Sequence, residues 1–329
     1  FSTDFRGFLF QDSQLGVRLF GNRFNNKLQY NVAWFRRLEK DTNSGQNDIF
    51  RRMRDDDIFV ANLYFQDAFT LGYTPQFTVV HNRNRENSRF YYDDNDFLQR
   101  PASLGDERLH RYNVTYVGFN GDGHFGRVNL THSLYGAFGT DKNNQFTGRE
   151  ADIRAYFAAA EPSIDFDWIR VRGSFVYASG DKDPFDDTEG GWSGIFENPQ
   201  IAGSDTSYWV RQGIPFIGGG GVGLKQRNSV TADLRSSKEH GQSNFNNPGI
   251  LLLGAGADFD VLPELRLTTN INHLSFADTS NLEFLRNQGS ISNSIGWDLS
   301  AAATYRPLNN QNIVFRLSGA VLLPSEGLK

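Results

Sequence analysis

The sequence contains no cysteine, and it has no long hydrophobic run. Without cysteine, this chain of 329 residues can form no disulfide, no thiolate metal site and no cysteine nucleophile. The mean hydropathy is −0.51, and no segment of about 20 apolar residues is present, which excludes a membrane-spanning helix. The chain begins at Phe1 without an initiator methionine or an apolar leader, so we expect a mature exported protein or a truncated N-terminus.

Lysine is also scarce, whereas arginine is abundant. The chain has 7 Lys and 26 Arg among 38 acidic residues, with a net charge of −5. The arginines are scattered between acids and form no basic stripe, which argues against a nucleic-acid partner. Because guanidinium groups make paired contacts in crowded polar surroundings, the arginine excess indicates a structured polar interior. Ordinary compositional bias is an equally good explanation.

The dominant pattern is an alternation of apolar and polar residues with period two. In 27–35, for example, one face consists of Leu28, Tyr30, Val32 and Trp34. Similar alternation occurs in 109–119, 127–134, 150–157, 168–177, 265–272, 295–305 and 313–321. Together with weaker segments, this pattern predicts about 12 to 14 strands. Helical periodicity is scarce, so we expect an all-β protein.

Two features distinguish a transmembrane barrel from a soluble β-sandwich. Aromatic residues lie on the apolar faces near strand ends, as do Trp34, Tyr112, Tyr116, Tyr177, Trp297 and Tyr305. Short links at 120–123, 160–163, 261–263 and 307–310 alternate with long ones at 39–57, 82–108, 138–149, 179–247 and 277–293. This predicts a single-domain antiparallel transmembrane β-barrel over 1–329, in a bacterial outer membrane, with about 14 or more strands. Short turns would lie on one side and long loops on the other.

In such a barrel the polar faces of the strands line the lumen. The predicted pore-lining residues are Arg111, Arg127, Asp152, Arg154, Arg170, Arg172, Arg266, Asp298 and Arg316. An arginine-rich wall favours anions, although the charges could instead pair with one another around a plugged lumen. The long loop 179–247, with Trp192, Trp209 and the glycine run at 218–221, is the best candidate to fold into or over the lumen.

The segment that begins at Ser179 is rich in aspartate. Carboxylates that could offer oxygen ligands to calcium are Asp181, Asp183, Asp186 and Asp187, although the spacing is not that of an EF-hand. The sequence has no HExxH zinc motif, no GxSxG elbow and no haem-binding CxxCH. We therefore predict no catalytic site and no cofactor other than a structural calcium ion.

The C-terminal quarter resembles a known group of barrels. The residues that carry the resemblance are Asn247, Pro248, Gly249, Pro263, Leu265, Phe276, Gly296, Asp298, Tyr305, Arg306, Pro307, Pro324 and Gly327, together with the SGDKDP stretch at Ser179. This pattern resembles bacterial outer-membrane channels of the alginate-export type and the barrel components of porin–cytochrome conduits. Such barrels commonly end in a terminal aromatic residue, whereas this chain ends Gly327–Leu328–Lys329.

The function expected from these features is a passive porin-like channel for small polar or anionic solutes. The alternative is a barrel that houses a multihaem cytochrome or another lumen-filling partner. The other expected partners are outer-membrane lipid and lipopolysaccharide. An outer-membrane lipid hydrolase would need a serine poised beside a histidine, and a soluble sugar-binding sandwich would need to cover its apolar faces.

Overall fold

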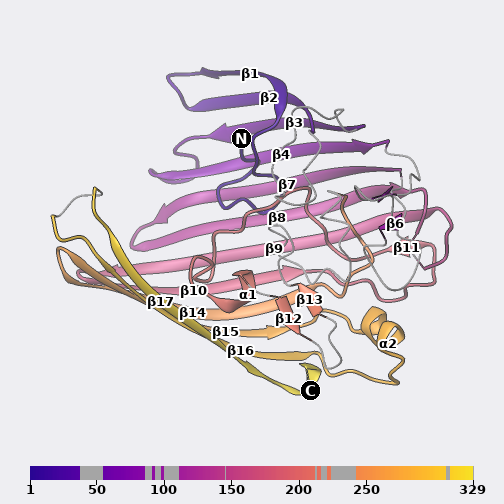
Figure 1. The fold of residues 1–329 in the computed structure, drawn as a ribbon. Coiled ribbons are helices and arrows are strands. Elements are labelled where there is room, and N and C mark those ends of the chain that lie inside the picture. Colours follow the sequence, from indigo (N-terminus) through magenta and orange to yellow (C-terminus); the bar gives the residue numbers. More distant parts are fainter. Residues whose placement is uncertain are drawn as a thin grey trace.

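The computed structural model describes residues 1–37, 55–85, 91–92, 98–99, 111–144, 146–211, 213–215, 221–223, 242–308 and 312–328. Their main sheet has 13 strands, of which the twelve long ones are antiparallel (Figure 1). The long strands, in sheet order, are β1 (Leu15–Arg23), β2 (Leu28–Arg36), β3 (Asp56–Phe65), β4 (Tyr73–Asn84), β7 (Tyr112–Phe125), β8 (Val128–Asp141), β9 (Ala151–Phe166), β10 (Ile169–Ala178), β14 (Ile250–Leu262), β15 (Leu265–Ser275), β16 (Ser294–Tyr305) and β17 (Phe315–Pro324). The predicted all-β antiparallel class is confirmed.

The remaining elements are short. β11 (Thr188–Glu189) pairs in parallel with β9, and two small ribbons pair β5 (Tyr91–Tyr92) with β6 (Leu98–Gln99) and β12 (Gly213–Pro215) with β13 (Gly221–Gly223). The helices are α1 (Tyr208–Arg211), α2 (Ser280–Arg286) and a 3₁₀ turn over Glu326–Leu328. Within the described residues, none of the helices has the length and apolar character to cross a membrane.

Every long strand pairs with its neighbours in chain order. Short and long connections alternate strictly along the chain. The short turns join β1–β2, β3–β4, β7–β8, β9–β10, β14–β15 and β16–β17 at one end of the sheet (Figure 1). The long connections, including 179–249, lie at the other end. Residues 218–220 of the glycine run lie outside the described residues, as do most of the connections 37–55 and 85–111.

Two of the predicted short links are in fact inside strands. The chain stays in register through 120–123 up to the pair Phe125–Val128, and Gly126, at φ +63°, supplies the turn. Likewise, 160–163 belongs to β9, and the turn comes at Asp167, which has φ +56°. The cluster at 120–123 has the residue types of a turn, but it stays paired with 130–133 as part of the ladder.

One face of the sheet is apolar and exposed, and we call it the outward face. Its exposed side chains include Val17, Val32, Trp34, Phe59, Val79, Val117, Leu134, Tyr177, Leu253, Ile271, Trp297, Tyr305 and Leu317. A monomeric soluble protein rarely exposes so extensive an apolar surface, whereas a barrel in lipid requires one. The aromatic residues Trp34, Tyr177, Trp297 and Tyr305 lie on this face, as predicted.

In β7 and β9 the two faces are the reverse of the expected ones. Tyr112, Val114 and Tyr116 are fully buried on the inward face of β7, and Ala151, Ile153, Ala155 and Phe157 are buried on the inward face of β9. The partners of these apolar side chains are not lipid but other parts of the same chain. The expectation that every apolar face looks at lipid was therefore wrong for these two strands.

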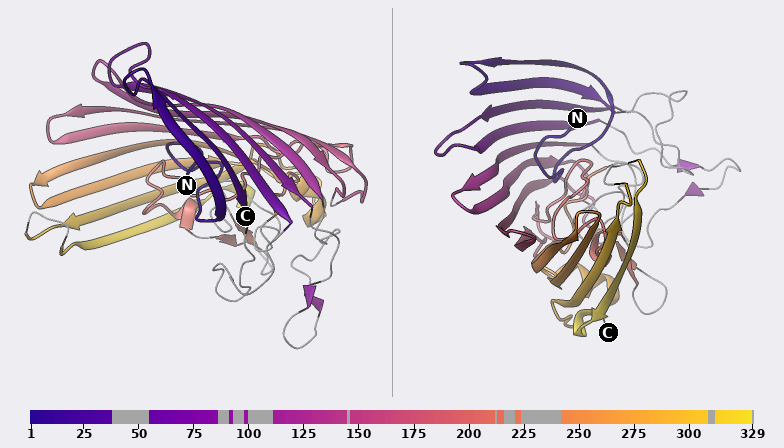
Figure 2. Two further views of the ribbon diagram at one scale, coloured as in Figure 1. Left: turned by 90° about the horizontal axis from the view of Figure 1, so that it is seen from above. Right: turned by 90° about the vertical axis from the view of Figure 1, so that its left-hand side faces the viewer.

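The sheet curves around segments of its own chain (Figure 2). The N-terminal residues 1–13, the stretch 179–209 and the stretch 242–249 lie against the concave, inward face. Gln76 of β4 donates to Thr3 O at 2.6 Å, and Tyr116 of β7 donates to Ser193 O at 2.9 Å. Among the described strands, β1 and β17 are the two edges of the sheet, so it is open between them.

An aromatic cluster holds these inner segments. Trp192 is 1% exposed, and its ring stacks on Tyr135 at 5.8 Å and on Phe157 at 5.2 Å. Phe8 packs on the other side of the cluster, at 4.9 Å from Phe157. Each aromatic residue buries a large apolar area, so these contacts fix the inserted segments against β8 and β9.

Candidate functional site: the lumenal wall

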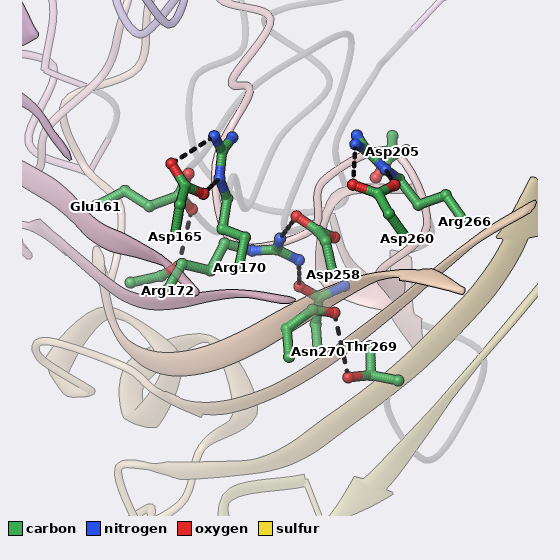
Figure 3. Close-up of polar contacts among 12 residues, drawn as sticks. Glu161, Asp165, Arg170, Arg172, Asp205, Asp258, Asp260, Arg266, Thr269 and Asn270 are labelled. Carbon is green, nitrogen blue, oxygen red and sulfur yellow. Dashed lines mark hydrogen bonds and ion pairs between the residues drawn. The ribbon is translucent and has the colours of Figure 1, made fainter. Parts of the chain in front are cut away.

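The charged residues on the inward face of β9, β10, β14, β15 and β17 lie toward the short-turn end of the sheet. We call this surface the lumenal wall; it consists of Glu161, Asp165, Arg170, Arg172, Asp258, Asp260, Arg266 and Arg316. All of these except Arg316 are labelled in Figure 3. The period of two brings them to one face because Asp165 is opposite Arg170 and Asp260 is opposite Arg266 in the strand register.

Two of its ion pairs are open to water. Arg170 binds Asp165 through Nε at 2.5 Å and a second nitrogen at 3.1 Å, and Arg266 binds Asp260 at 2.6 and 2.8 Å. The side chains of the Arg266–Asp260 pair are both 49% exposed. Because the side chains of both pairs are about half exposed, their guanidinium groups are accessible to solutes.

Arg172 is less accessible. Its side chain is 10% exposed, and it binds Asp258 and Asn270, each at 2.5 Å. Asn270 in turn donates to Ser300 Oγ at 3.3 Å. This network connects β10, β14, β15 and β16 across the inward face, so Arg172 braces the wall.

Other charges join the wall to the inserted segments. Arg316 binds Asp205 and donates to Thr206 Oγ1 at 2.6 Å. Arg6 donates to Gln200 O at 3.2 Å and lies 3.6 Å from Glu161, whose other oxygen accepts the Ala202 N–H at 2.9 Å. Two inserted segments, 1–13 and 200–209, are thus fixed to the wall by charged hydrogen bonds.

Asp298 has a different role from the predicted one. It is fully buried, and its two oxygens accept the backbone N–H groups of Tyr208 and Trp209 at 3.1 and 3.2 Å. The carboxylate faces inward, but it holds the start of α1 instead of presenting a charge to the lumen. The neighbouring Ala202 carbonyl accepts from Ser207 Oγ and Asn272 Nδ2, which fixes the same segment.

Four other predicted pore-lining residues lie elsewhere. Asp152 and Arg154 are exposed on the outward face of β9, opposite the buried Ile153, and pair with each other at 2.8 Å. Arg111 is exposed just before β7, in phase with the outward Asn113. Arg127 is exposed in the β7–β8 turn. The predictions for Arg111, Asp152 and Arg154 followed from the facing of β7 and β9, which the structure reverses. Arg127 was placed on the polar face of the next strand, but it lies in the turn before β8.

Sequence reasoning missed several members of the wall. Asp258 and Asp260 alternate with apolar residues at the end of β14, so the same periodicity could have placed them. Glu161 and Asp165 were missed because the strand was expected to end before them. Arg6 and Asp205 belong to inserted segments, and no periodicity reveals that they meet Glu161 and Arg316.

Each of the four aspartates of the predicted calcium site has a different hydrogen-bond or ion-pair partner. Asp181 Oδ1 accepts Gly190 N–H, Asp183 and Asp186 accept backbone N–H groups of their own turns, and Asp187 pairs with Arg149. Within the described part of the chain, His, Asp and Glu side chains form no group of three suited to a metal ion. Burial, with the nearby charge of Asp186, raises the pKa of Asp181 to about 7.

The fold and its two faces define the class of the protein. An antiparallel wall with an apolar outward face, a charged inward face, tight turns at one end and long connections at the other is that of a porin-like outer-membrane β-barrel. Barrels of this class lie in bacterial outer membranes and have a polar interior.

Comparison with known proteins gives similarities to solved structures. OccK2 (OpdF) of Pseudomonas aeruginosa, in complex with glucuronate, is 14% identical with a TM-score of 0.44, over 93% of this chain and 64% of that one. The outer membrane protein OpdK has 13% identity and the same TM-score and coverage. OccK11 (OpdR) has 11% identity and a TM-score of 0.44, over 95% of this chain and 66% of that one. OpdK and OccK11 are also from Pseudomonas aeruginosa. The chain thus spans less than two thirds of each. No protein-family model and no curated protein matches it.

Proposed function

We propose that the protein is a passive outer-membrane channel for small polar solutes, with a preference for those that bear a carboxylate. The observation that carries the proposal is the half-exposed Arg266–Asp260 pair on the lumenal wall, with Arg170–Asp165 beside it. Both pairs point to the concave side of a sheet whose other face is apolar. Solutes would pass along this wall.

The chemistry of paired arginines suits transient binding. A guanidinium has five N–H donors, and Arg266 directs only Nε and one terminal nitrogen at Asp260. The remaining N–H groups can bind a passing carboxylate. The adjacent aspartate keeps the net charge low, so that binding is weak enough for release, as conduction requires.

The inserted segments supply size selection. Residues 1–13 and 179–209 cover much of the inward face, and Trp192 and Trp209 of the second segment are buried. Because these segments occupy part of the concave side, they leave less room there for a solute than the sheet alone would. This supports small solutes as the substrate class.

The same covering is less suited to a barrel that sheathes a cytochrome, because segments of the chain already occupy the space that a lumenal partner would need. Haem absorbance that stays with the purified protein through size-exclusion chromatography would favour the sheath instead of the channel.

Ion selectivity tests the proposal directly. Single-channel conductance in a planar bilayer, with the reversal potential measured in a salt gradient, should show anion preference. Arg266→Gln should shift the permeability ratio toward cations by about twofold, the effect of one partly screened charge. The matched control is Arg154→Gln, which removes an outward arginine and should leave the ratio unchanged. Equal ratios for all three proteins, or no conductance from the folded protein, would contradict the proposal.

A further inference from the structure

Three cations stand side by side on the outward surface at the long-loop end. The register pairs Asn84 with Tyr112 and Tyr112 with Asp141, so the next residues, Arg85, Arg111 and Lys142, are neighbours across β4, β7 and β8. The Lys142 N–H donates to Arg111 O at 2.9 Å, which confirms the alignment. All three residues are exposed.

Their charges are only partly compensated. Arg85 pairs with Asp57 at 3.2 Å, and Lys142 pairs with Glu150 at 2.5 Å. Asp57 is shared, because Arg36 lies 3.6 Å from it. Within the described residues the Arg111 side chain has no hydrogen bond or ion pair. One row below, Arg83 is also exposed on the outward face. Like charges on adjacent strands repel, so a bound anion would stabilise the row formed by Arg85, Arg111 and Lys142.

An apolar groove opens on the same face, beside these cations. It has a volume of about 430 Å³, and its lining includes Val17, Val32, Trp34, Phe59, Val79 and His81. His81 is two residues from Arg83 along β4, and Trp34 donates to Asp57 at 3.1 Å, so the groove ends where the charged row begins. Its walls are hydrocarbon and aromatic, which suits an acyl chain.

We propose that this outward surface binds a phosphate-bearing lipid of the outer leaflet. An acyl chain lies in the groove of β1–β4, and the phosphate is held by Arg83, Arg85 and Arg111. Long loops of outer-membrane barrels are extracellular, so the cations stand at the headgroup level of that leaflet. Arginine binds phosphate through paired N–H donors, whereas a headgroup without phosphate or another anion offers no such acceptor. The site rests on the outer-membrane location given under the proposed function.

Binding to lipid A in a neutral detergent tests the site, with native mass spectrometry as the readout. Arg111→Gln should weaken the binding about fivefold, as expected for one cation near a charged lipid surface. This variant removes no ion pair of the described residues, so the fold should persist. The matched control is Arg127→Gln, an exposed arginine in a turn at the opposite end, which should bind like the unchanged protein.

A second variant and two competitors separate the sources of binding. Val79→Trp fills the groove and should weaken lipid A binding while leaving the charged row intact. Competition by excess inorganic phosphate alone would indicate a simple anion site, and equal binding of diacylglycerol, which carries no phosphate, would indicate a nonspecific apolar surface. Either result would overturn the proposal, as would equal losses in Arg111→Gln and Arg127→Gln.

Conductance in phosphatidylcholine bilayers distinguishes the two proposals. A conducting protein in which Arg111→Gln leaves lipid A binding unchanged refutes the lipid site alone. A protein that binds lipid A through Arg111 but does not conduct refutes the channel alone.

Discussion

Asp181 is an acidic residue whose burial changes its chemistry. It is 2% exposed in the segment after β10, and Asp186 and Asp278 add repulsion. Because burial raises its pKa to about 7 in the folded protein, the folded state holds a proton that the unfolded state releases near pH 4. The free energy of unfolding should therefore fall as the pH rises from about 4 to about 7, and stay level above that.

Asp181→Asn should remove this pH dependence. At pH 8 the variant should be more stable than the unchanged protein by on the order of 2–4 kcal/mol, and at pH 4 the two should be equal. Urea unfolding midpoints at both pH values measure the difference, and the exposed Asp183→Asn serves as the control. A calcium-dependent rise in midpoint that only the unchanged protein shows would support the predicted calcium ion. Equal pH slopes for the variant and the unchanged protein would refute the assignment to Asp181.

At the scale of elements, the inserted segments matter more than any single strand. Asp298 of β16 holds the start of α1 through two backbone hydrogen bonds, and Arg316 and Glu161 hold the residues just before it. The segment 200–209 therefore depends on acceptors from β9 and β16 and on a donor from β17. Gly203, at φ +68°, lies against Asn270 and leaves no room for a Cβ atom there.

Loss of the Asp298 carboxylate should loosen this segment. Asp298→Ala removes both acceptors, at a cost of about 1–3 kcal/mol, and the conductance and its open-channel noise should increase. Asp298→Asn keeps an acceptor oxygen and should resemble the unchanged protein more closely. Single-channel recordings compare the three, and an Asp298→Ala channel with unchanged noise would show that 200–209 does not border the path.

The two faces of the sheet have different surroundings. The outward face contacts lipid, and the inward face contacts water and the inserted segments. A charge on the outward face should therefore cost more near the middle of the sheet than near its ends. Val117→Arg should destabilise the protein in lipid vesicles by about 2–4 kcal/mol, and Asn113→Arg, on the same face of β7 near the long-loop end, by about 0–1 kcal/mol. Urea titration of both variants in vesicles measures the difference. Equal costs would argue against a lipid-facing surface.

The sequence by itself determined the strands, their antiparallel order and the alternation of short and long connections, because alternation and turn chemistry are local. It also placed Arg170, Arg172, Arg266 and Arg316 on the inward face, since in β10, β15 and β17 polar residues alternate with apolar ones that face outward. Only the tertiary structure decided the facing of β7 and β9, the partners of Arg6 and Asp205, and the anchoring role of Asp298. In those places, apolar and charged side chains contact segments that are distant in the sequence. Local periodicity carries no information about such contacts, so it cannot show which face of a strand is covered.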